Sequence, residues 1–150
     1  MASCCAPLPA LLKVCPMCGV KGKAVSLLTV QSLVMEPASL HADLVYLLCR
    51  TKACPVVYFA PGALLLKKDV AVRVGFKESE DPIPLCYCFG YARGDIRNEL
   101  ALTGHTEIPD KIKVEIQAGR CSCEVKNPAG SCCLGDILAA AKALAAEIVQ

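Results

Sequence analysis

Tryptophan is absent from this 150-residue sequence, and tyrosine and phenylalanine bring the aromatic content to only 5%. Proteins that bind nucleic acids commonly combine aromatic stacking surfaces with clustered basic residues. This chain lacks both features, because its formal net charge is only +2 and its lysines and arginines are scattered. We therefore expect no nucleic-acid partner, and a zinc-ribbon adaptor for nucleic acid or protein is the least favoured function.

Histidine is also scarce. His41 and His105 are the only two, and neither lies beside a convincing nucleophile or acid pair. Histidine is the commonest general acid–base residue, so this composition argues against hydrolytic catalysis. We expect a protein that is not an enzyme, with a metal reductase activity left open.

Long apolar runs are missing, although the mean hydropathy is +0.47. Charged residues interrupt every apolar stretch before it reaches the roughly 18 residues that a membrane span requires. The start of the chain has no basic segment followed by an apolar one, as a secretory signal would. The sequence predicts a cytoplasmic protein without membrane insertion.

Cysteine, by contrast, is abundant, with 12 in 150 residues. In a reducing cytosol, paired thiols are more often metal ligands than disulfides. Cys4 and Cys5 lie in a Pro- and Ala-rich segment, which we interpret as a flexible N-terminal tail over residues 1–12. Adjacent thiols also suit soft ions such as Cu(I), so this pair is a second candidate metal site.

Four cysteines in the first half of the chain predict a structural zinc site. Cys15 and Cys18 form a Cys-x-x-Cys-Gly turn, and Cys49 and Cys54 form a later pair with four intervening residues. Four thiolates match a closed tetrahedral zinc centre, although the spacing departs from the common zinc-ribbon pattern. Two alternatives are unligated core cysteines and a redox-active Cys15–Cys18 pair.

A second cysteine-rich region runs from Cys86 to Cys133. It opens with Cys86-Tyr87-Cys88 and closes with a segment containing Cys121, Cys123, Cys132 and Cys133 around an Asn-Pro-Ala-Gly turn. Two loops that each supply thiols favour a [2Fe–2S] cluster, which is held by four cysteine thiolates.

Local patterns predict a β-rich first half. Residues 24–30 and 56–59 are β-prone, 70–76 alternates as a half-buried strand, and 40–48 is either a strand or a short helix. Residues 77–84 are charged and contain two prolines, which indicates a linker.

The second half is predicted to be helical. We expect one helix over 93–102 ending at Gly104, and another that begins near 106–110 and ends at Gly119, although 111–117 also alternates like a strand. The last helix carries one apolar stripe, formed by Leu134, Ile137, Leu138, Ala141, Leu144, Ala145 and Ile148. Cys133 stands at its head, where the helix dipole is expected to lower a thiol pKa.

These motifs together resemble the N-terminal domain of the CopZ-type copper chaperones. The resemblance includes the Cys15/Cys18 and Cys49/Cys54 pairs, Val-Val-Tyr-Phe after Cys54, Cys-Tyr-Cys, and the Asn-Pro-x-Gly-x-Cys-Cys close. The second half is similar to bacterioferritin-associated ferredoxin. The resemblance implies one mononuclear zinc and one [2Fe–2S] cluster.

It also implies the cluster ligands, which we place at Cys86, Cys88, Cys123 and Cys133. Cys123 is chosen over Cys121 because it matches the family pattern. Cys121 and Cys132 each lie near a chosen ligand and remain either substitutes for it or small buried residues.

The implied fold is α+β, with a zinc-ribbon-like domain over 13–80 and a helical [2Fe–2S] domain over 81–150. CopZ-type proteins usually continue into a copper-carrying domain with a Met-x-Cys-x-x-Cys loop, a motif absent from this sequence. We therefore expect copper, as Cu⁺, to be carried by a separate protein or by Cys4 and Cys5.

The leading functional hypothesis is a redox metallochaperone or accessory protein in copper handling. Its cluster would pass one electron and reduce Cu(II) to Cu(I). The expected partners are a copper carrier domain or a copper-transporting P-type ATPase, with an electron donor that the sequence does not identify. The alternative is a ferredoxin-type electron-transfer protein that serves an oxidoreductase.

Overall fold

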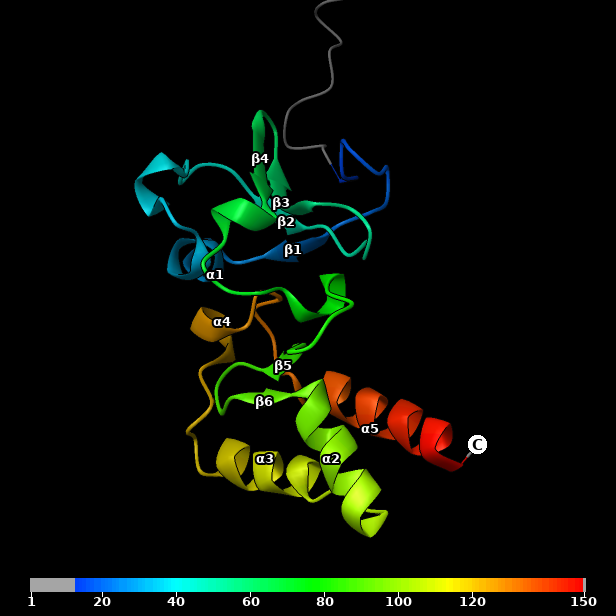
Figure 1. Cartoon of the computed structure of the whole chain (residues 1–150). Coiled ribbons are helices and arrows are strands. Elements are labelled where there is room, and N and C mark those ends of the chain that lie inside the picture. The colour runs from blue at the N-terminus through cyan, green and yellow to red at the C-terminus, as the bar shows by residue number, and fades with distance from the viewer. Residues whose placement is uncertain (1–12, 150) are drawn as a thin grey trace, which may run out of the picture.

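The structure, a computed structural model, describes residues 13–149. It is a mixed α/β fold in which a four-stranded antiparallel sheet lies above a group of three longer helices (Figure 1). Cys4 and Cys5 lie outside the described residues. Within residues 13–149, no helix is both long and apolar enough to cross a membrane.

The sheet has the order β1-β2-β3-β4. Its strands are β1 Lys23–Val25, β2 Tyr46–Leu48, β3 Val56–Ala60 and β4 Ala63–Leu66. All five residues of β3 are buried, and its pairing with β4 shifts register between Val56 and Tyr58. Such a bulge turns neighbouring side chains away from strict alternation. As a result β3 contributes to two buried clusters, one with the zinc-site cysteines and one with α1.

Two strand predictions in this half are wrong. Residues 24–30 form a strand only to Val25, because Ser26 then caps α1 (Leu27–Leu33) by accepting a hydrogen bond from the Thr29 N–H at 3.1 Å. Hydroxyl side chains at this position stabilise a helix start. Residues 70–76 form bends followed by the 3₁₀ helix η5 (Gly75–Lys77), in which Val70 and Val74 are buried without strand pairing beyond one bridge from Val70 to Val34.

Two further predictions concern strands β3 and β2. Residues 56–59 lie in β3, and the ambiguous stretch 40–48 contains strand β2. Two further short 3₁₀ helices are η3 (Pro37–Ser39), between α1 and β2, and η4 (Lys67–Asp69), directly after β4.

The second half contains the predicted helices. A small sheet of β5 (Pro84–Cys86) and β6 (Tyr91–Ala92) leads into α2 (Arg93–Thr103), which ends at Gly104 in the left-handed conformation. It is followed by α3 (Ile108–Gln117), α4 (Cys123–Lys126) and α5 (Leu134–Val149). The ambiguous stretch 111–117 is therefore helical.

A separate core holds these helices together. It is built around Ile96, Ile112, Ile137 and Leu144, together with Cys86 and Cys133. The predicted stripe of α5 is too wide, because Leu138 and Ile148 are 44% and 46% exposed. The buried residues of two clusters all precede position 80, and those of the third all follow it. The division into domains 13–80 and 81–150 stays a prediction.

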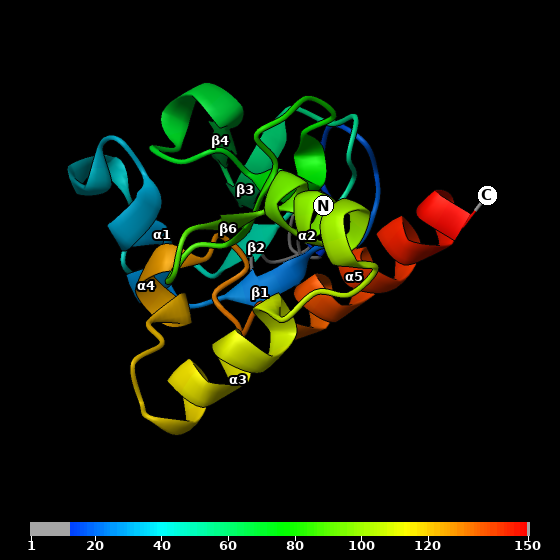
Figure 2. The same ribbon diagram turned by 60° about the horizontal axis from the view of Figure 1, so that its bottom comes forward.

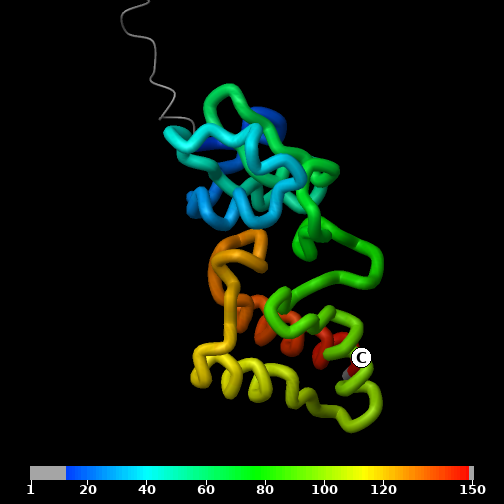
Figure 3. The backbone as a smooth tube through the Cα atoms, turned by 90° about the vertical axis from the view of Figure 1, so that its left-hand side faces the viewer, coloured from blue at the N-terminus to red at the C-terminus, as the bar shows by residue number. Residues whose placement is uncertain are grey.

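The two halves meet at α4 and the turn after it. Helix α4 packs against α1, and the orange segment of the tube rises from the helical layer to the underside of the sheet layer (Figures 2 and 3). This arrangement places a cysteine-bearing helix of one half directly on the other half.

Candidate metal centres

The first cysteine pair lies in a tight turn before the sheet. The Cys15 N–H donates to the Val20 carbonyl at 2.9 Å, and the Gly19 N–H donates to the Cys15 carbonyl at 2.7 Å. Gly19 has a φ of +76°, a conformation that glycine adopts without steric cost. The Cys-x-x-Cys-Gly motif thereby directs Cys15 and Cys18 toward one point.

The second pair brackets the loop between β2 and β3. Cys49 follows β2 and donates its N–H to the Val57 carbonyl at 2.8 Å, while the Cys54 N–H donates to the Thr51 carbonyl at 3.2 Å. Backbone hydrogen bonds therefore hold the loop in place at both Cys49 and Cys54.

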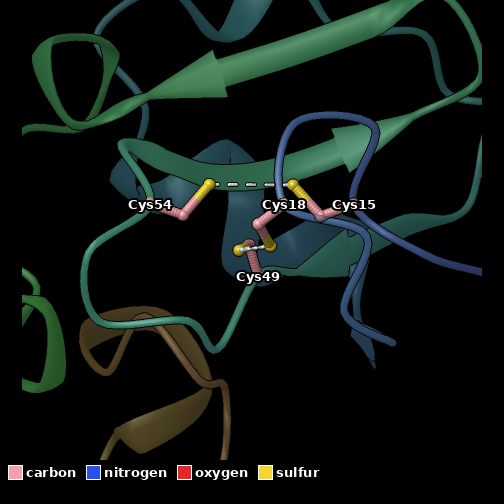
Figure 4. A group of neighbouring side chains, drawn as sticks. All are labelled: Cys15, Cys18, Cys49 and Cys54. Carbon is pink, nitrogen blue, oxygen red and sulfur yellow. Dashed lines mark hydrogen bonds between the residues drawn. The ribbon is translucent and has the colours of Figure 1, made fainter.

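The four thiols meet at one point, as the sequence predicts (Figure 4). All four sulfurs lie within 4.8 Å of one another; Cys15 and Cys54 are 3.8 Å apart, and Cys18 and Cys49 are 3.7 Å apart. A tetrahedral zinc site with Zn–S bonds of about 2.3 Å has sulfur–sulfur edges of about 3.8 Å. The geometry thus fits a zinc ion with four thiolates and no open coordination position.

The environment of the thiols also favours a bound cation. A hydrogen bond with the Thr51 hydroxyl, 3.2 Å away, lowers the pKa of Cys18 to about 6, whereas burial raises the pKa of Cys54 to about 12. Burial also raises the pKa of Cys15. Buried thiolates of this kind need a positive charge, which a metal supplies.

The four cysteines of the second group lie at four different places in the fold. Cys86 ends β5, Cys88 lies in the turn before β6, Cys123 begins α4, and Cys133 immediately precedes α5. The Cys88 and Cys123 sulfurs are 3.5 Å apart, and Cys86 and Cys133 are both about 1% exposed in the core.

These thiols pair rather than gather at one point. Besides the Cys88–Cys123 contact, Cys86 and Cys133 lie together in one buried cluster. Among residues 13–149, only the zinc-site cysteines form a single group of three or more close ligand atoms. Two pairs are what a binuclear cluster requires, because its four thiolates are divided between two irons.

Backbone amides approach this second group. The Ser122 N–H donates to the Cys88 sulfur at 3.1 Å. Burial raises the pKa of Cys123 to about 12, and the Cys133 backbone N–H acts in the opposite direction. Burial, and then the Cys86 thiol, raise the pKa of Cys133, so the prediction of a lowered pKa at this helix start is wrong.

The two additional thiols are placed differently from the four predicted ligands. Cys132 is exposed, whereas its neighbour Cys133 is buried; Cys121 is partly exposed, as are Cys88 and Cys123. Cys123, and not Cys121, contacts Cys88. His41 and His105 are both exposed.

Sequence analysis missed polar residues that fix the segments around the second cysteine group. The buried Asn127 side chain accepts the Ala129 N–H at 3.0 Å and donates to the Ser131 carbonyl at 2.7 Å, which fixes the Asn-Pro-Ala-Gly turn. The Tyr87 hydroxyl donates to the Arg73 carbonyl at 2.6 Å. An asparagine before proline, and a tyrosine between two cysteines, are the available sequence signals.

The fold and the first centre define a protein with a four-thiolate metal-binding domain. A family model described as a CopZ zinc-binding domain matches residues 12–71. The copper chaperone CopZ of Archaeoglobus fulgidus is 34% identical over 123 residues, which cover 79% of this chain and 57% of that protein.

A solved structure agrees with the sequence comparison. The X-ray structure of the N-terminal domain of Archaeoglobus fulgidus CopZ superimposes with a TM-score of 0.68 at 31% identity. The match covers 84% of this chain and 95% of that domain. The chain belongs to the family of CopZ N-terminal domains, and it spans 57% of the length of the full CopZ chaperone.

Proposed function

We propose that this protein is a redox-active accessory in copper handling, in which Cys86, Cys88, Cys123 and Cys133 hold a [2Fe–2S] cluster. Family membership and the four-cysteine group support metal handling in copper homeostasis. The observation that carries the finer proposal is the 3.5 Å approach of Cys88 and Cys123 from segments 35 residues apart.

The chain's own residues suit the cluster. Cys86 and Cys133 lie in a core of isoleucine and leucine side chains, which limits the access of water. The Ser122 N–H to the Cys88 sulfur is the kind of hydrogen bond that raises the reduction potential of such centres. When bound, a [2Fe–2S] cluster supplies one-electron transfer. We propose that residues 81–150 form the ferredoxin-like domain that holds it.

Copper is the proposed cargo and not a resident cofactor. One electron from an external donor converts one Cu(II) to Cu(I), the form that thiol ligands prefer. We place the protein in the cytoplasm, and its proposed recipients are a copper carrier domain or a copper-transporting P-type ATPase. The zinc centre takes no part in this chemistry, because Zn²⁺ is redox-inert and its four ligands leave no open position.

The visible spectrum of anaerobically purified protein tests the cluster. We expect thiolate- and sulfide-to-iron bands that bleach on addition of dithionite, with two irons and two sulfides per chain. Cys123→Ser should abolish these bands and Cys132→Ser should retain them. Protein that stays colourless after reconstitution with iron and sulfide would overturn the cluster.

The copper step needs its own test. We expect reduced protein, freed of dithionite, to convert about one more Cu(II) to Cu(I) per cluster than oxidised protein does, detected with a Cu(I)-specific chelator. Cys123→Ser protein should show no such difference, because its free thiols reduce Cu(II) equally in both samples. Fast electron transfer to protein acceptors with no reaction toward Cu(II) would instead favour the ferredoxin-type function.

A further inference from the structure

A lysine is buried beside the four-thiolate centre. Lys77 ends η5 and is only 3% exposed. Its ammonium donates to the Thr51 carbonyl at 2.7 Å and to the Cys54 carbonyl at 3.0 Å. Both acceptors belong to the loop that carries Cys49 and Cys54, so the side chain reaches from the end of the first half into the metal-binding loop.

Within residues 13–149, no carboxylate forms an ion pair with this ammonium. Glu78, the next residue, pairs instead with Lys67 at 3.6 Å and with Arg73 at 3.1 Å. The Phe76 ring, whose centroid is 5.7 Å from the Lys77 nitrogen, gives only weak support. Buried charges are almost always paired or bound to metal, so this ammonium requires an explanation.

The loaded metal centre provides the missing negative charge. A divalent cation with four thiolates carries a net charge of about −2, and three of the four cysteines are fully buried. The contacts lead directly to the sulfurs: Thr51 accepts from Lys77 through its carbonyl, and its hydroxyl lies 3.2 Å from the Cys18 sulfur.

We propose that Lys77 is the counter-cation of the four-thiolate centre and the positioning residue of the loop that bears Cys49 and Cys54. Its charge lowers the electrostatic cost of gathering four thiolates, and its two hydrogen bonds hold the loop in the ligating conformation. The inference rests on the metal site described above and is independent of the iron–sulfur cluster.

Cobalt(II) is the probe, because Zn²⁺ has a filled d shell and no visible bands. The purified full chain, freed of metal and refolded anaerobically with Co²⁺, reports the field at the sulfurs through its sulfur-to-cobalt charge-transfer band. The d–d bands report the coordination geometry separately. Lys77→Met removes the charge and both hydrogen bonds, Lys77→Gln removes the charge and keeps an amide donor, and Lys68→Met is the matched control at an exposed lysine.

Both Lys77 variants should shift the charge-transfer band to lower energy, because the thiolates lose a stabilising positive charge, while the d–d bands stay tetrahedral. We expect their Co²⁺ and Zn²⁺ affinities, measured by chelator competition, to fall about 10- to 100-fold. Lys68→Met should match the wild type. If Lys77→Met does not fold, Lys77→Gln carries the test.

Three results would overturn the inference in different ways. A Lys77→Gln protein with wild-type band energy and affinity would show that Lys77 acts only as a hydrogen-bond donor. Equal shifts in Lys77→Gln and Lys68→Met would show that any nearby charge has the same effect. A wild-type protein without a tetrahedral Co²⁺ spectrum would remove the metal site itself.

Discussion

The buried hydroxyl of Tyr58 donates a 2.6 Å hydrogen bond to the carbonyl of Pro128, 70 residues away. Tyr58 is the centre of β3, and Pro128 lies in the turn between Cys123 and Cys133. Nearby, the Thr29 hydroxyl donates to the Glu124 carbonyl at 2.6 Å. The sheet of the first half therefore directly supports the segment that bears two of the proposed cluster ligands.

Tyr58→Phe tests this support. The change leaves the Pro128 carbonyl without its donor, and an unsatisfied buried acceptor costs about 1–3 kcal/mol. We expect that loss in the free energy of unfolding measured in urea. We also expect faster amide hydrogen exchange over residues 123–131.

Tyr46→Phe is the matched control. The Tyr46 hydroxyl accepts a hydrogen bond from the His41 N–H, and because His41 is exposed, water can replace that acceptor. Equal effects of the two substitutions would show that the Pro128 bond has no special role.

Removing one thiol tests the four-cysteine site. Cys54 is 5% exposed and its sulfur lies 3.8 Å from that of Cys15. Cys54→Ser should leave the protein with little or no bound zinc, because an incomplete thiolate set binds the ion far more weakly. Zinc is measured by atomic emission after gel filtration with a chelator.

Cys121→Ser provides the control, since Cys121 is partly exposed and lies outside the four-thiol group. It should keep its full zinc content and its thermal midpoint. Zinc retained equally by both variants would contradict the assignment.

The gathering of Cys15, Cys18, Cys49 and Cys54 could be predicted because part of its geometry is local. A Cys-x-x-Cys-Gly turn requires little more than its own backbone, and the structure shows Cys15 and Cys18 in such a turn. Helices α2 and α3 could also be predicted from local signals, because Gly104 marks the end of α2 and Pro109 marks the start of α3.

Local patterns were misleading where tertiary contacts dominate. Residues 27–33 contain β-prone side chains, yet the Ser26 cap and burial against the sheet make them helical. Residues 70–76 alternate like a strand, yet the Gly75 N–H bonds to the Tyr87 hydroxyl at 2.9 Å rather than to a strand. The Ser26 cap is a local signal that the sequence carries. The contact between Gly75 and Tyr87, by contrast, joins residues 12 apart and leaves no periodic signal.

The pH dependence of the free energy of unfolding should show how much the Glu99 carboxylate stabilises the fold. The carboxylate accepts hydrogen bonds from the Thr106 hydroxyl at 2.7 Å and the Glu107 N–H at 2.8 Å, which lower its pKa below the usual 4.5. A lowered folded-state pKa stabilises the fold above the unfolded-state pKa, and that stabilisation is lost as the pH falls through the folded-state value.

Glu99→Gln should therefore be less stable than the wild type at pH 7, and the difference should shrink in urea titrations carried out progressively below pH 4.5. Glu147→Gln is the control, because Glu147 is 62% exposed and its partner Arg93 is 3.5 Å away. A pH-independent difference for Glu99→Gln would show that the carboxylate charge is not responsible.

Gly130→Ala tests the contact between the two halves most directly. Gly130 has a φ of +68°, and a β-carbon there would lie 2.8 Å from the Thr29 hydroxyl oxygen. Gly119 offers a matched control, because its φ is +73° but nothing lies within 4 Å of its position for a β-carbon. Each substitution carries the left-handed penalty of about 1–2 kcal/mol, so the difference between them isolates the contact with Thr29. We expect Gly130→Ala to lose more stability in urea unfolding than Gly119→Ala.

We also expect Gly130→Ala protein to bind less iron on reconstitution, because Thr29 can no longer hold the Glu124 carbonyl beside Cys123. Equal losses for the two variants would mean that the turn moves away from α1 without cost, and that the first half does not position the second cysteine group.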